Sequence, residues 1–291
     1  MNRILAFLGA LVLAFISVSS ACTAAPATWI HFTLEPQHGN AAEIQASFRK
    51  EGGGHGDNNW STGFRPGDLA GLDLAGFRAA GTRPLRFSVN REAGRLDCSG
   101  HGGESYAAGN CGFTANPQFV QLLVNRGIGR PSDEQAFGLM AVNARRELIE
   151  ALASARYPKP TIDDLMALSA LGVNGGYVGG LARAGYRPQN IQTLIEFKAL
   201  DITPEWIGGY VRIGYANLPA DELVQLKALD ITPDFIAGFD RIGYRHLPVD
   251  QLVQLKALDI TPEFVRRVAA VDASLPPVDK LVQLKTFGKR H

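Results

Sequence analysis

The chain carries almost no net charge. It has 29 lysines and arginines against 28 aspartates and glutamates among 291 residues, for a formal charge of +1. Arg3 is the one charged residue ahead of Cys22, so a chain cleaved before Cys22 would be neutral (+1 − 1 = 0). A neutral protein lacks the long-range attraction that draws proteins to nucleic acids or anionic membranes. The composition therefore argues against a nucleic-acid partner.

Catalytic motifs are also lacking. The six histidines form no His-Glu-x-x-His motif. No Gly-x-Ser-x-Gly elbow accompanies His101-Gly-Gly-Glu-Ser105, which has the glycines of an esterase oxyanion loop, so this segment is interpreted as a hairpin tip. His55, Asp57 and His101 are the alternative, a metal site, although their spacing fits no recognised ligand pattern. We assign no catalytic residue and no cofactor, and favour a non-catalytic protein over an enzyme or small-ligand binder centred on these loops.

Cysteine is scarce, with three residues of this type in the chain. Cys98 and Cys111 flank a glycine-rich stretch, and an even pair in an exported protein predicts a disulfide. Closing a loop of about 15 residues, close to the length between these two cysteines, is worth roughly 3 kcal/mol in the chain-entropy model. A metal pair or two reactive thiols are the alternatives, but no second ligand pair with metal spacing is present.

The one long apolar run lies at the N-terminus. Arg3 is followed by uncharged residues 4–16 and then by Ser19-Ser-Ala21. A basic start, a short apolar core and small residues at the exit are typical of a secretory signal peptide, here residues 1–21. An uncleaved membrane anchor is the alternative, but the run is shorter than the roughly 18–20 apolar residues that span a bilayer.

Cys22 adds an option for the mature N-terminus. Ser19-Ser-Ala-Cys22 resembles the lipobox of bacterial lipoproteins, whose cysteine becomes lipidated, although Ser19 stands where that motif prefers leucine. Ordinary cleavage after Ala21 or Ala25 explains the same residues. We expect export to the periplasm, anchoring in the outer membrane or secretion, with membrane contact only through a lipid on Cys22.

Residues 26–116 show the alternation of short strands. Glu43–Arg49 and Arg83–Asn90 alternate clearly, residues 29–34 do so in part, and Cys111–Ala115 closes the series. Glu92-Ala-Gly-Arg95 predicts a hairpin turn, and residues 52–59 a longer loop. We expect a small antiparallel sheet or open sandwich. Residues 69–77 fit either a short helix or an irregular connector.

The C-terminal part of the chain, residues 161–291, repeats itself at a fixed interval. Hexapeptides related to Leu-Lys-Ala-Leu-Asp-Ile begin at Leu168, Phe197, Leu226 and Leu255, and a truncated copy begins at Leu284, so that successive starts differ by 29 in residue number. Residues 218–233 and 247–262 are identical at 14 of 16 positions. A period of this size marks a stack of small units, each too small to bury its apolar face alone.

Each unit predicts two helices, which we call the A helix and the B helix. In residues 218–246, the A helix opens at Leu218-Pro and is apolar around most of its circumference, so it must be covered on several sides. Thr232 is a good N-cap and Pro233 a good first residue for the B helix, which should reach about Ile242. Gly243-Tyr244 should end it, with the glycine in the left-handed conformation and the tyrosine folded back on the last turn.

The predicted fold class is α+β, a small antiparallel β module followed by an α-solenoid of two-helix repeats. The expected domains are the β module with its disulfide (26–116), a helical connector with a degenerate capping repeat (117–160) and the repeat domain (161–291). The closing helix, residues 277–287, leads into a polar exit, Gly-Lys-Arg-His, that should cap the stack against solvent.

The repeat carries one family resemblance. Residues 221–236, followed by Arg241-Ile-Gly-Tyr244, resemble short helical repeats in many bacterial exported proteins and in the extracytoplasmic tails of BlaR/MecR-type antirepressor sensors, a family of membrane metallopeptidases. The likeness covers residues 161–291 well and 119–160 loosely, and it implies an extracytoplasmic helical repeat. It implies no peptidase activity, because the multiple membrane helices and the zinc motif of those sensors are missing here.

Charged residues recur in columns along the predicted B helices. Acids lie at the starts of these helices and arginines near their ends, and the candidate binding residues are Glu205, Arg212, Asp234, Arg241, Glu263 and Arg266. One interpretation is a charged ladder for an extended partner; the other is complementarity to the helix dipole, worth about 0.3–1 kcal/mol per charge. Trp206/Tyr210 and Phe235/Phe239 are expected to pack between repeats, with an aromatic peptide groove as the alternative.

A lysine column recurs in the A helices. Its members are Lys198, Lys227, Lys256 and Lys285. They are expected to snorkel, with their stems on the core and their amines in water, and a polyanion site is the alternative.

The whole pattern predicts an exported, non-catalytic protein that binds another protein or an envelope component through its helical repeats. A structural envelope protein whose repeats self-associate is a further alternative.

Overall fold

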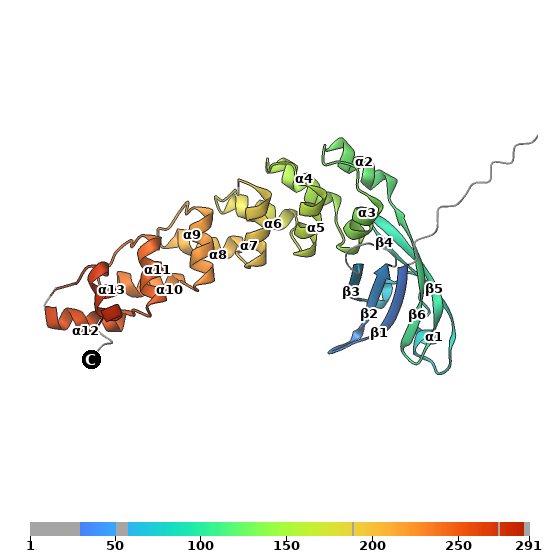
Figure 1. Ribbon diagram of the computed structural model, residues 1–291, viewed down its shortest axis with the longest axis horizontal. Helices are drawn as coiled ribbons and strands as arrows, with labels where there is room; N and C mark the ends of the chain where they lie inside the picture. Colours follow the sequence, from blue (N-terminus) through green and yellow to red (C-terminus); the bar gives the residue numbers. More distant parts are fainter. Residues whose placement is uncertain (1–29, 51–57, 188, 273, 288–291) are drawn as a thin grey trace, which may run out of the picture.

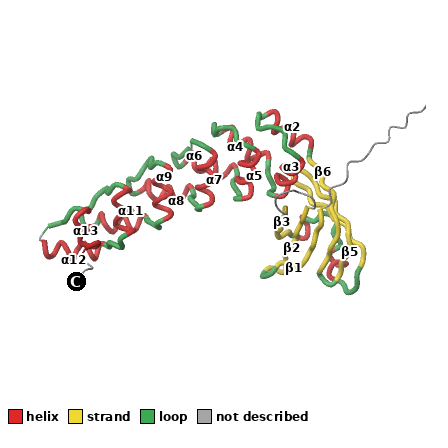
Figure 2. Tube along the Cα trace, in the orientation of Figure 1, coloured by secondary structure: helices red, strands yellow, loops and turns green. Residues whose placement is uncertain are grey.

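The computed structural model describes residues 30–50, 58–187, 189–272 and 274–287. The predicted signal peptide, Cys22, His55, Asp57 and the polar exit 288–291 lie outside the described residues. The fold is α+β: an N-terminal antiparallel sheet is followed by helices that extend away from it in an elongated array (Figure 1). The boundary between strands and helices is sharp, because the last strand ends at Ala115 and helix α2 begins at Pro117 (Figure 2).

The β part is one six-stranded sheet with the order β3-β2-β1-β6-β5-β4. All neighbouring strands pair antiparallel. The expected sheet is therefore confirmed, as a single sheet without the second layer of a sandwich among the described residues. Its strands are β1 (Ile30–Gln37), β2 (Asn40–Lys50), β3 (Asn58–Phe64), β4 (Arg83–Arg91), β5 (Gly94–Gly103) and β6 (Tyr106–Ala115).

Alternation along the strands places the apolar side chains on one face. Phe32 pairs with Phe48 across β1 and β2, and the Phe32 ring packs edge-on against Phe87 with 5.0 Å between the centroids. The segment predicted as either helix or connector contains both: a bridge joins Ala70 to Ser88, and helix α1 (Leu74–Arg78) packs on β4, β5 and β6. The opposite face of the sheet carries mainly polar side chains.

The β5–β6 hairpin accounts for the glycine-rich stretch. Glu104 and Ser105 form its turn with φ of 54° and 65°, the left-handed values that a tight hairpin turn requires. Their backbone N–H groups donate to the carbonyls of Ala79 and Phe77 at the end of α1, which fixes the tip. Gly100 lies opposite Gly109, and a Cβ on Gly100 would come within 2.1 Å of the Ala108 carbonyl oxygen. The predicted hairpin tip is therefore confirmed, and the glycines on its two strands lie at a close backbone approach.

The helical array alternates A and B helices without interruption among the described residues. The A helices are α3 (Asp133–Ala141), α5 (Ile162–Ala170), α7 (Ile191–Ala199), α9 (Ala220–Ala228), α11 (Val249–Ala257) and α13 (Val278–Phe287). The B helices are α2 (Pro117–Asn125), α4 (Arg146–Ser154), α6 (Gly175–Arg183), α8 (Pro204–Arg212), α10 (Pro233–Asp240) and α12 (Pro262–Asp272). Successive starts within each set keep the interval found in the sequence from Leu168 onward, and that interval already holds at Pro117.

Local signals set the ends of these helices. Thr203 and Thr232 accept hydrogen bonds from the N–H groups three residues on, as predicted N-caps should. Gly243 has a φ of 105°, and the Tyr244 N–H donates to the Phe239 carbonyl, which closes the B helix as expected. The A helices end in the same way with Asp230 and its counterparts in the left-handed region, at a φ of 49° for Asp230.

Neighbouring helices of the same set pack on one another. Contacts join α3 to α5, α5 to α7, α9 to α11 and α11 to α13 among the A helices, and α4 to α6 and α6 to α8 among the B helices. The B helices approach closely where a glycine faces the proline of the next B helix. A Cβ on Gly180 would lie 2.7 Å from Cγ of Pro204, and one on Gly238 would lie 3.1 Å from Cγ of Pro262.

Arg91, at the end of β4, joins the sheet to the array. Its guanidinium lies 4.7 Å from the centroid of the Trp60 ring and donates to the carbonyls of Met140 and Ala141 at the end of α3. A cation at a helix C-terminus and over an aromatic face is favoured by both neighbours. Burial, together with the charge of Arg145, lowers the pKa of Arg91 to about 10.

In the described part of the chain, no single helix is both long and apolar enough to cross a bilayer. One pair, α5 and α6, meets the length and composition threshold only when its two helices are counted together, and these helices meet at a bend of 87°.

Candidate binding surfaces

The charged residues predicted on the B helices are all exposed. Glu205, Asp234 and Glu263 lie in the first turns, whereas Arg212 ends α8 and Arg241 follows α10. No ion pair joins these residues across neighbouring repeats within the described chain. The starts of α8, α10 and α12 thus carry negative charge, and the ends of α8 and α10 carry positive charge, as the helix dipole favours.

Local contacts within each helix hold several of these side chains. Arg241 Nε donates to the Ala237 carbonyl one turn back, at 3.1 Å. Arg266, in the turn that follows Glu263, forms an ion pair with it at 3.2 Å. Hydrogen bonds from its own backbone and from the Thr261 hydroxyl lower the pKa of the Glu263 carboxyl. Dipole complementarity therefore accounts for the three acids and for Arg212 and Arg241, whereas the ion pair with Glu263 accounts for Arg266. Only the exposure of these side chains makes them available to a partner.

The lysine column has a structural role that the sequence interpretation missed. Each amine lies over an aromatic ring of the preceding B helix, 5.2 Å from the ring centroid for Lys256 on Phe235 and 5.4 Å for Lys227 on Trp206. Lys256 also donates to the Asp230 carbonyl at 2.8 Å, at the end of the previous A helix. The amines that were expected to lie in water therefore also link consecutive repeats. The full set of pairs is Lys198–Tyr177, Lys227–Trp206, Lys256–Phe235 and Lys285–Phe264.

The aromatic residues of the B helices pack inside the array. Trp206 and Tyr210 are in ring contact at 4.5 Å between centroids, and Tyr210 is 1% exposed. Phe235 and Phe239 repeat this contact at 5.1 Å. These residues pack as expected: Tyr210 and Phe239 are buried, and Trp206 and Phe235 are half-buried against the core.

The tyrosines that follow the B helices connect repeats through their hydroxyl groups. Tyr215 Oη donates to the Leu247 carbonyl at 2.7 Å, just ahead of the second A helix that follows, and Tyr244 donates to the Pro276 carbonyl in the same way. The Tyr244 ring packs on Phe239 in the last turn of its own helix, with 6.3 Å between the centroids, as expected, while its hydroxyl reaches forward along the array. Burial, with the nearby charge of Asp240, raises the pKa of Tyr215 to about 12.

The histidine-centred alternative gains no support from the described residues. His101 is exposed on β5, opposite Pro84 and Ala108. Within the ranges that the structure describes, no group of three or more His, Cys, Asp or Glu side chains is placed to hold a metal ion. His55 and Asp57 lie outside those ranges.

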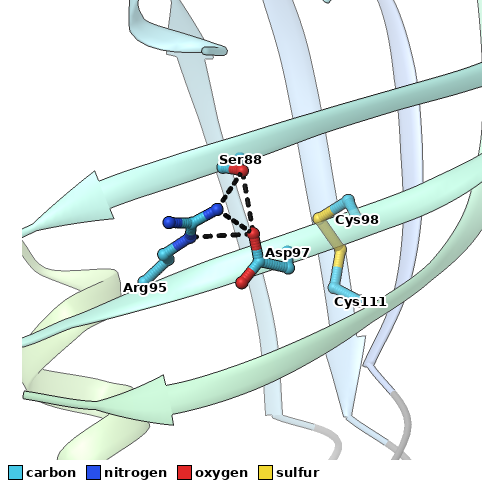
Figure 3. The surroundings of a disulfide bond; sticks show 5 residues. All are labelled: Ser88, Arg95, Asp97, Cys98 and Cys111. Carbon is cyan, nitrogen blue, oxygen red and sulfur yellow. Dashed lines mark hydrogen bonds and ion pairs between the residues drawn. A yellow bond between two sulfur atoms is a disulfide. The ribbon is translucent and has the colours of Figure 1, made fainter. Parts of the chain in front are cut away.

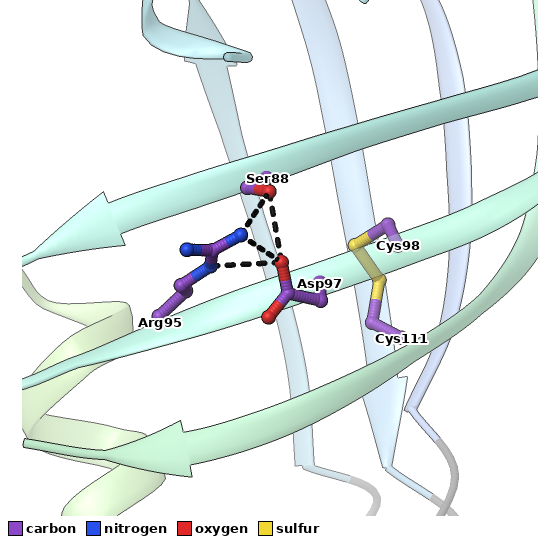
Figure 4. A network of polar contacts seen from close by, with 5 residues as sticks. All are labelled: Ser88, Arg95, Asp97, Cys98 and Cys111. Carbon is purple, nitrogen blue, oxygen red and sulfur yellow. Dashed lines mark hydrogen bonds and ion pairs between the residues drawn. A yellow bond between two sulfur atoms is a disulfide. The ribbon is translucent and has the colours of Figure 1, made fainter. Parts of the chain in front are cut away.

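The predicted disulfide is confirmed. Cys98 on β5 and Cys111 on β6 are directly opposite each other and join the two strands on the buried face of the sheet (Figure 3). On the exposed face, Asp97 accepts hydrogen bonds from Arg95 Nε at 2.8 Å and Ser88 Oγ at 2.9 Å (Figure 4). The bond from Arg95 lowers the pKa of the Asp97 carboxyl. This network links β4 to β5 on the exposed face of the sheet.

A cavity of about 610 Å³ lies where the sheet meets the array. Trp60 on β3 forms one wall, and α3 and α5 form the other. The Trp60 ring itself is held between Phe48, stacked at 4.8 Å, and the guanidinium of Arg91. The remaining lining residues of α3, α5 and their flanks are Ser132, Glu134, Gln135, Phe137, Gly138, Ala141, Val142, Asp163 and Met166, with Asn59 beside Trp60. Sequence reasoning missed this cavity because its two walls come from separate predicted domains, which lie far apart along the chain.

Comparison with protein-family models, curated proteins and solved structures finds no match to this chain. The resemblance to short helical repeats of exported bacterial proteins therefore stays a prediction.

Proposed function

We propose that the helices from α2 to α13, Pro117 to Phe287, form a solenoid of two-helix repeats, and that the exported protein uses it to bind another protein or an envelope component without catalysis. The observation that carries the proposal is the constant spacing of helix starts from Pro117 to Val278. Equivalent side chains then recur on equivalent helices, and stacked helical repeats of this kind present extended surfaces to partners. Lysine–aromatic pairs and tyrosine hydroxyls between consecutive repeats favour such a stack.

Export fits the disulfide, because disulfides persist in oxidising compartments outside the cytoplasm. The same context agrees with the proposed likeness to short helical repeats in exported bacterial proteins. The charged columns of the B helices supply one candidate contact surface, with Glu205, Asp234 and Glu263 at the helix starts and Arg212 and Arg241 at the helix ends. Arg266 lies beside Glu263.

Site-specific photo-crosslinking tests this function. A photoreactive residue replaces Asp234 in one variant and Ser99, which is exposed on β5, in a control variant. We expect a discrete adduct with an envelope component from position 234 and from the equivalent positions 205 and 263, but not from position 99. An identical adduct pattern from the sheet position, or no adduct from any helical position, would contradict binding through the repeats.

A further inference from the structure

The A helices expose a second surface, and we infer that it is a groove for an extended basic polypeptide whose apolar side chain enters the cavity beside Trp60. This inference rests on the proposed function, that the helical repeats bind a partner, and it names the face and the chemistry of that partner. It differs from the surface predicted on the B helices.

From α5 onward, each A helix exposes side chains at the same set of positions on the face opposite the core. Leucines at the fourth position, such as Leu223 and Leu252, are buried, whereas the second, fifth, sixth and ninth positions are exposed or half-buried. These positions lie on one face of a helix. The fifth position holds a half-buried apolar side chain in each of these helices: Met166, Ile195, Val224, Val253 and Val282. Contacts join α5 to α7, α9 to α11 and α11 to α13, and the A helices follow one another along the array, so these side chains form a partly exposed apolar column (Figure 1).

The cavity lies at the sheet end of this column. Met166 is both the first member of the half-buried set and part of the cavity wall, and Phe137, which also lines the cavity, holds the same position one repeat earlier in α3. A volume of about 610 Å³ falls within the range of roughly 300–1,000 Å³ that is typical of ligand pockets. The cavity can therefore hold a large apolar side chain of a segment that continues along the column.

The charges on the A helices indicate which charge the bound segment should carry. The second position is acidic in five of the six A helices, at Glu134, Asp163, Asp221, Asp250 and Asp279, and Gln192 is the exception. Among the described residues, the cavity lining contains two of these carboxylates and no lysine, arginine or histidine. The A-helix lysines at the eighth position contact aromatic rings, and Lys280 is the one basic residue beside an acid of this column. Charge complementarity therefore favours a basic partner and disfavours an anionic one.

Spacing adds a further constraint. Packed helices are about 8–10 Å apart. A chain in the polyproline II conformation advances about 3.1 Å per residue with three residues per turn, so every third side chain returns to the same side after about 9.3 Å. A partner with lysine or arginine at every third residue would therefore place one basic side chain at the second position of each A helix, which is acidic except at Gln192.

Fluorescence polarisation with labelled peptides tests the inference on the full chain. One peptide repeats Lys-Pro-Leu, a second has the same composition with all its lysines in one block, and a third repeats Glu-Pro-Leu. We expect the first to bind at least about tenfold more tightly than the second, since only its charges match the repeat spacing. The Glu-Pro-Leu peptide should not bind.

Two matched double variants locate the site. Asp221→Lys with Asp250→Lys reverses the A-helix column, and Glu205→Lys with Asp234→Lys makes the same change in net charge on the B helices. The first pair should weaken binding of the Lys-Pro-Leu peptide at least about tenfold, and the second by less than about twofold. Gly138→Leu, which adds a side chain to the cavity wall beside Met166, should also weaken binding, and circular dichroism checks that each variant is folded.

Three results would overturn the inference. Equal binding of the two lysine peptides would remove the spacing argument, and equal loss in the two double variants would mean unspecific attraction. Absence of binding would also overturn it. In each case, crosslinks from positions 205, 234 and 263 would still support the proposed function, so the two failures are distinguishable.

Discussion

Gly180 offers a direct test of how closely the B helices pack. It lies in α6, and an added methyl group would come within 2.7 Å of Cγ and 3.3 Å of Cβ of Pro204, at the start of the next B helix. The proline ring cannot rotate away. At the adjacent Gly179, the nearest atom is a guanidinium nitrogen of Arg183 at 3.4 Å, the free end of a flexible side chain. Gly179→Ala is therefore a matched control in the same helix.

The two substitutions gain the same helix propensity, but only Gly180→Ala adds a steric clash. Alanine is favoured over glycine inside a helix by about 1 kcal/mol at both positions. Overpacking at Gly180 costs about 1–3 kcal/mol, because the contact is far shorter than the usual separation of about 3.5–4 Å. We expect Gly180→Ala to be less stable than Gly179→Ala by about 2 kcal/mol, with Gly179→Ala more stable than the parent chain.

Urea unfolding followed by far-UV circular dichroism measures the difference, provided that both variants keep the same denaturant dependence. Stacked repeats can unfold in parts, so amide hydrogen exchange in α6 and α8 gives a local reading. If Gly180→Ala proves as stable as Gly179→Ala, the close B-helix contact on which the packing argument depends does not exist in solution.

Three further predictions concern stability. Replacing Cys98 and Cys111 by serine should lower the free energy of unfolding by about 3 kcal/mol, seen as a fall in the urea midpoint that reductant reproduces in the parent chain. Asp230→Gly should stabilise the protein by up to about 1 kcal/mol and so raise its thermal midpoint, because Asp230 has a positive φ of 49° that glycine adopts without strain. The control Asp221→Gly, inside a helix, should lower the thermal midpoint. Burial raises the pKa of Tyr215 from 10 to about 12, so the folded state retains a proton that the unfolded state loses first. That contribution to stability is complete below pH 10 and is lost as the pH rises toward 12; Tyr215→Phe should flatten the pH dependence of the urea midpoint, and an unchanged slope would contradict it.

The helices of the array were predictable because their signals are local. Thr232 and Pro233 mark a helix start, and Gly243 marks a helix end, wherever the surrounding chain lies. The regular spacing at α2, α3 and α4 was predicted only in part, as a degenerate capping repeat within residues 117–160, because few of the marking residues are present there, although the helix positions persist. Packing against a neighbour at a fixed distance preserves the position of a helix after its sequence signature has changed.

The sheet was harder to predict in detail. Strand β3 is an edge strand of mostly small and polar residues, so its alternation is weak. Strands β5 and β6 contain glycines at Gly100, Gly102 and Gly109, residues that normally indicate turns. Tertiary packing explains these glycines, because the opposing backbone and the Phe32 ring leave no room for a Cβ at Gly109. A cross-strand approach of this kind has no local signal.

The candidate surfaces also include features that the sequence predicted and features that it did not. The charged columns on the B helices follow from spacing alone, and the structure shows them exposed. The contacts of Lys256 with Phe235 and with the Asp230 carbonyl could not be predicted, because they join residues of different helices. The cavity beside Trp60 requires the docking of the sheet on α3 and α5, which no periodicity indicates.

That docking follows the chemistry of the repeats themselves. Glu147 accepts a hydrogen bond from the N–H of Gly175 at 3.0 Å, the first residue of the next B helix. Glu92, in the β4–β5 turn, accepts one from the N–H of Arg146 at 2.8 Å, the first residue of α4. Later B helices begin with proline, as at Pro204, which has no N–H to satisfy. The turn of the sheet thus supplies to α4 the carboxylate that α4 supplies to α6. Because Arg91 also satisfies the carbonyls at the end of α3, the sheet takes the place of a preceding repeat and caps the array at this end.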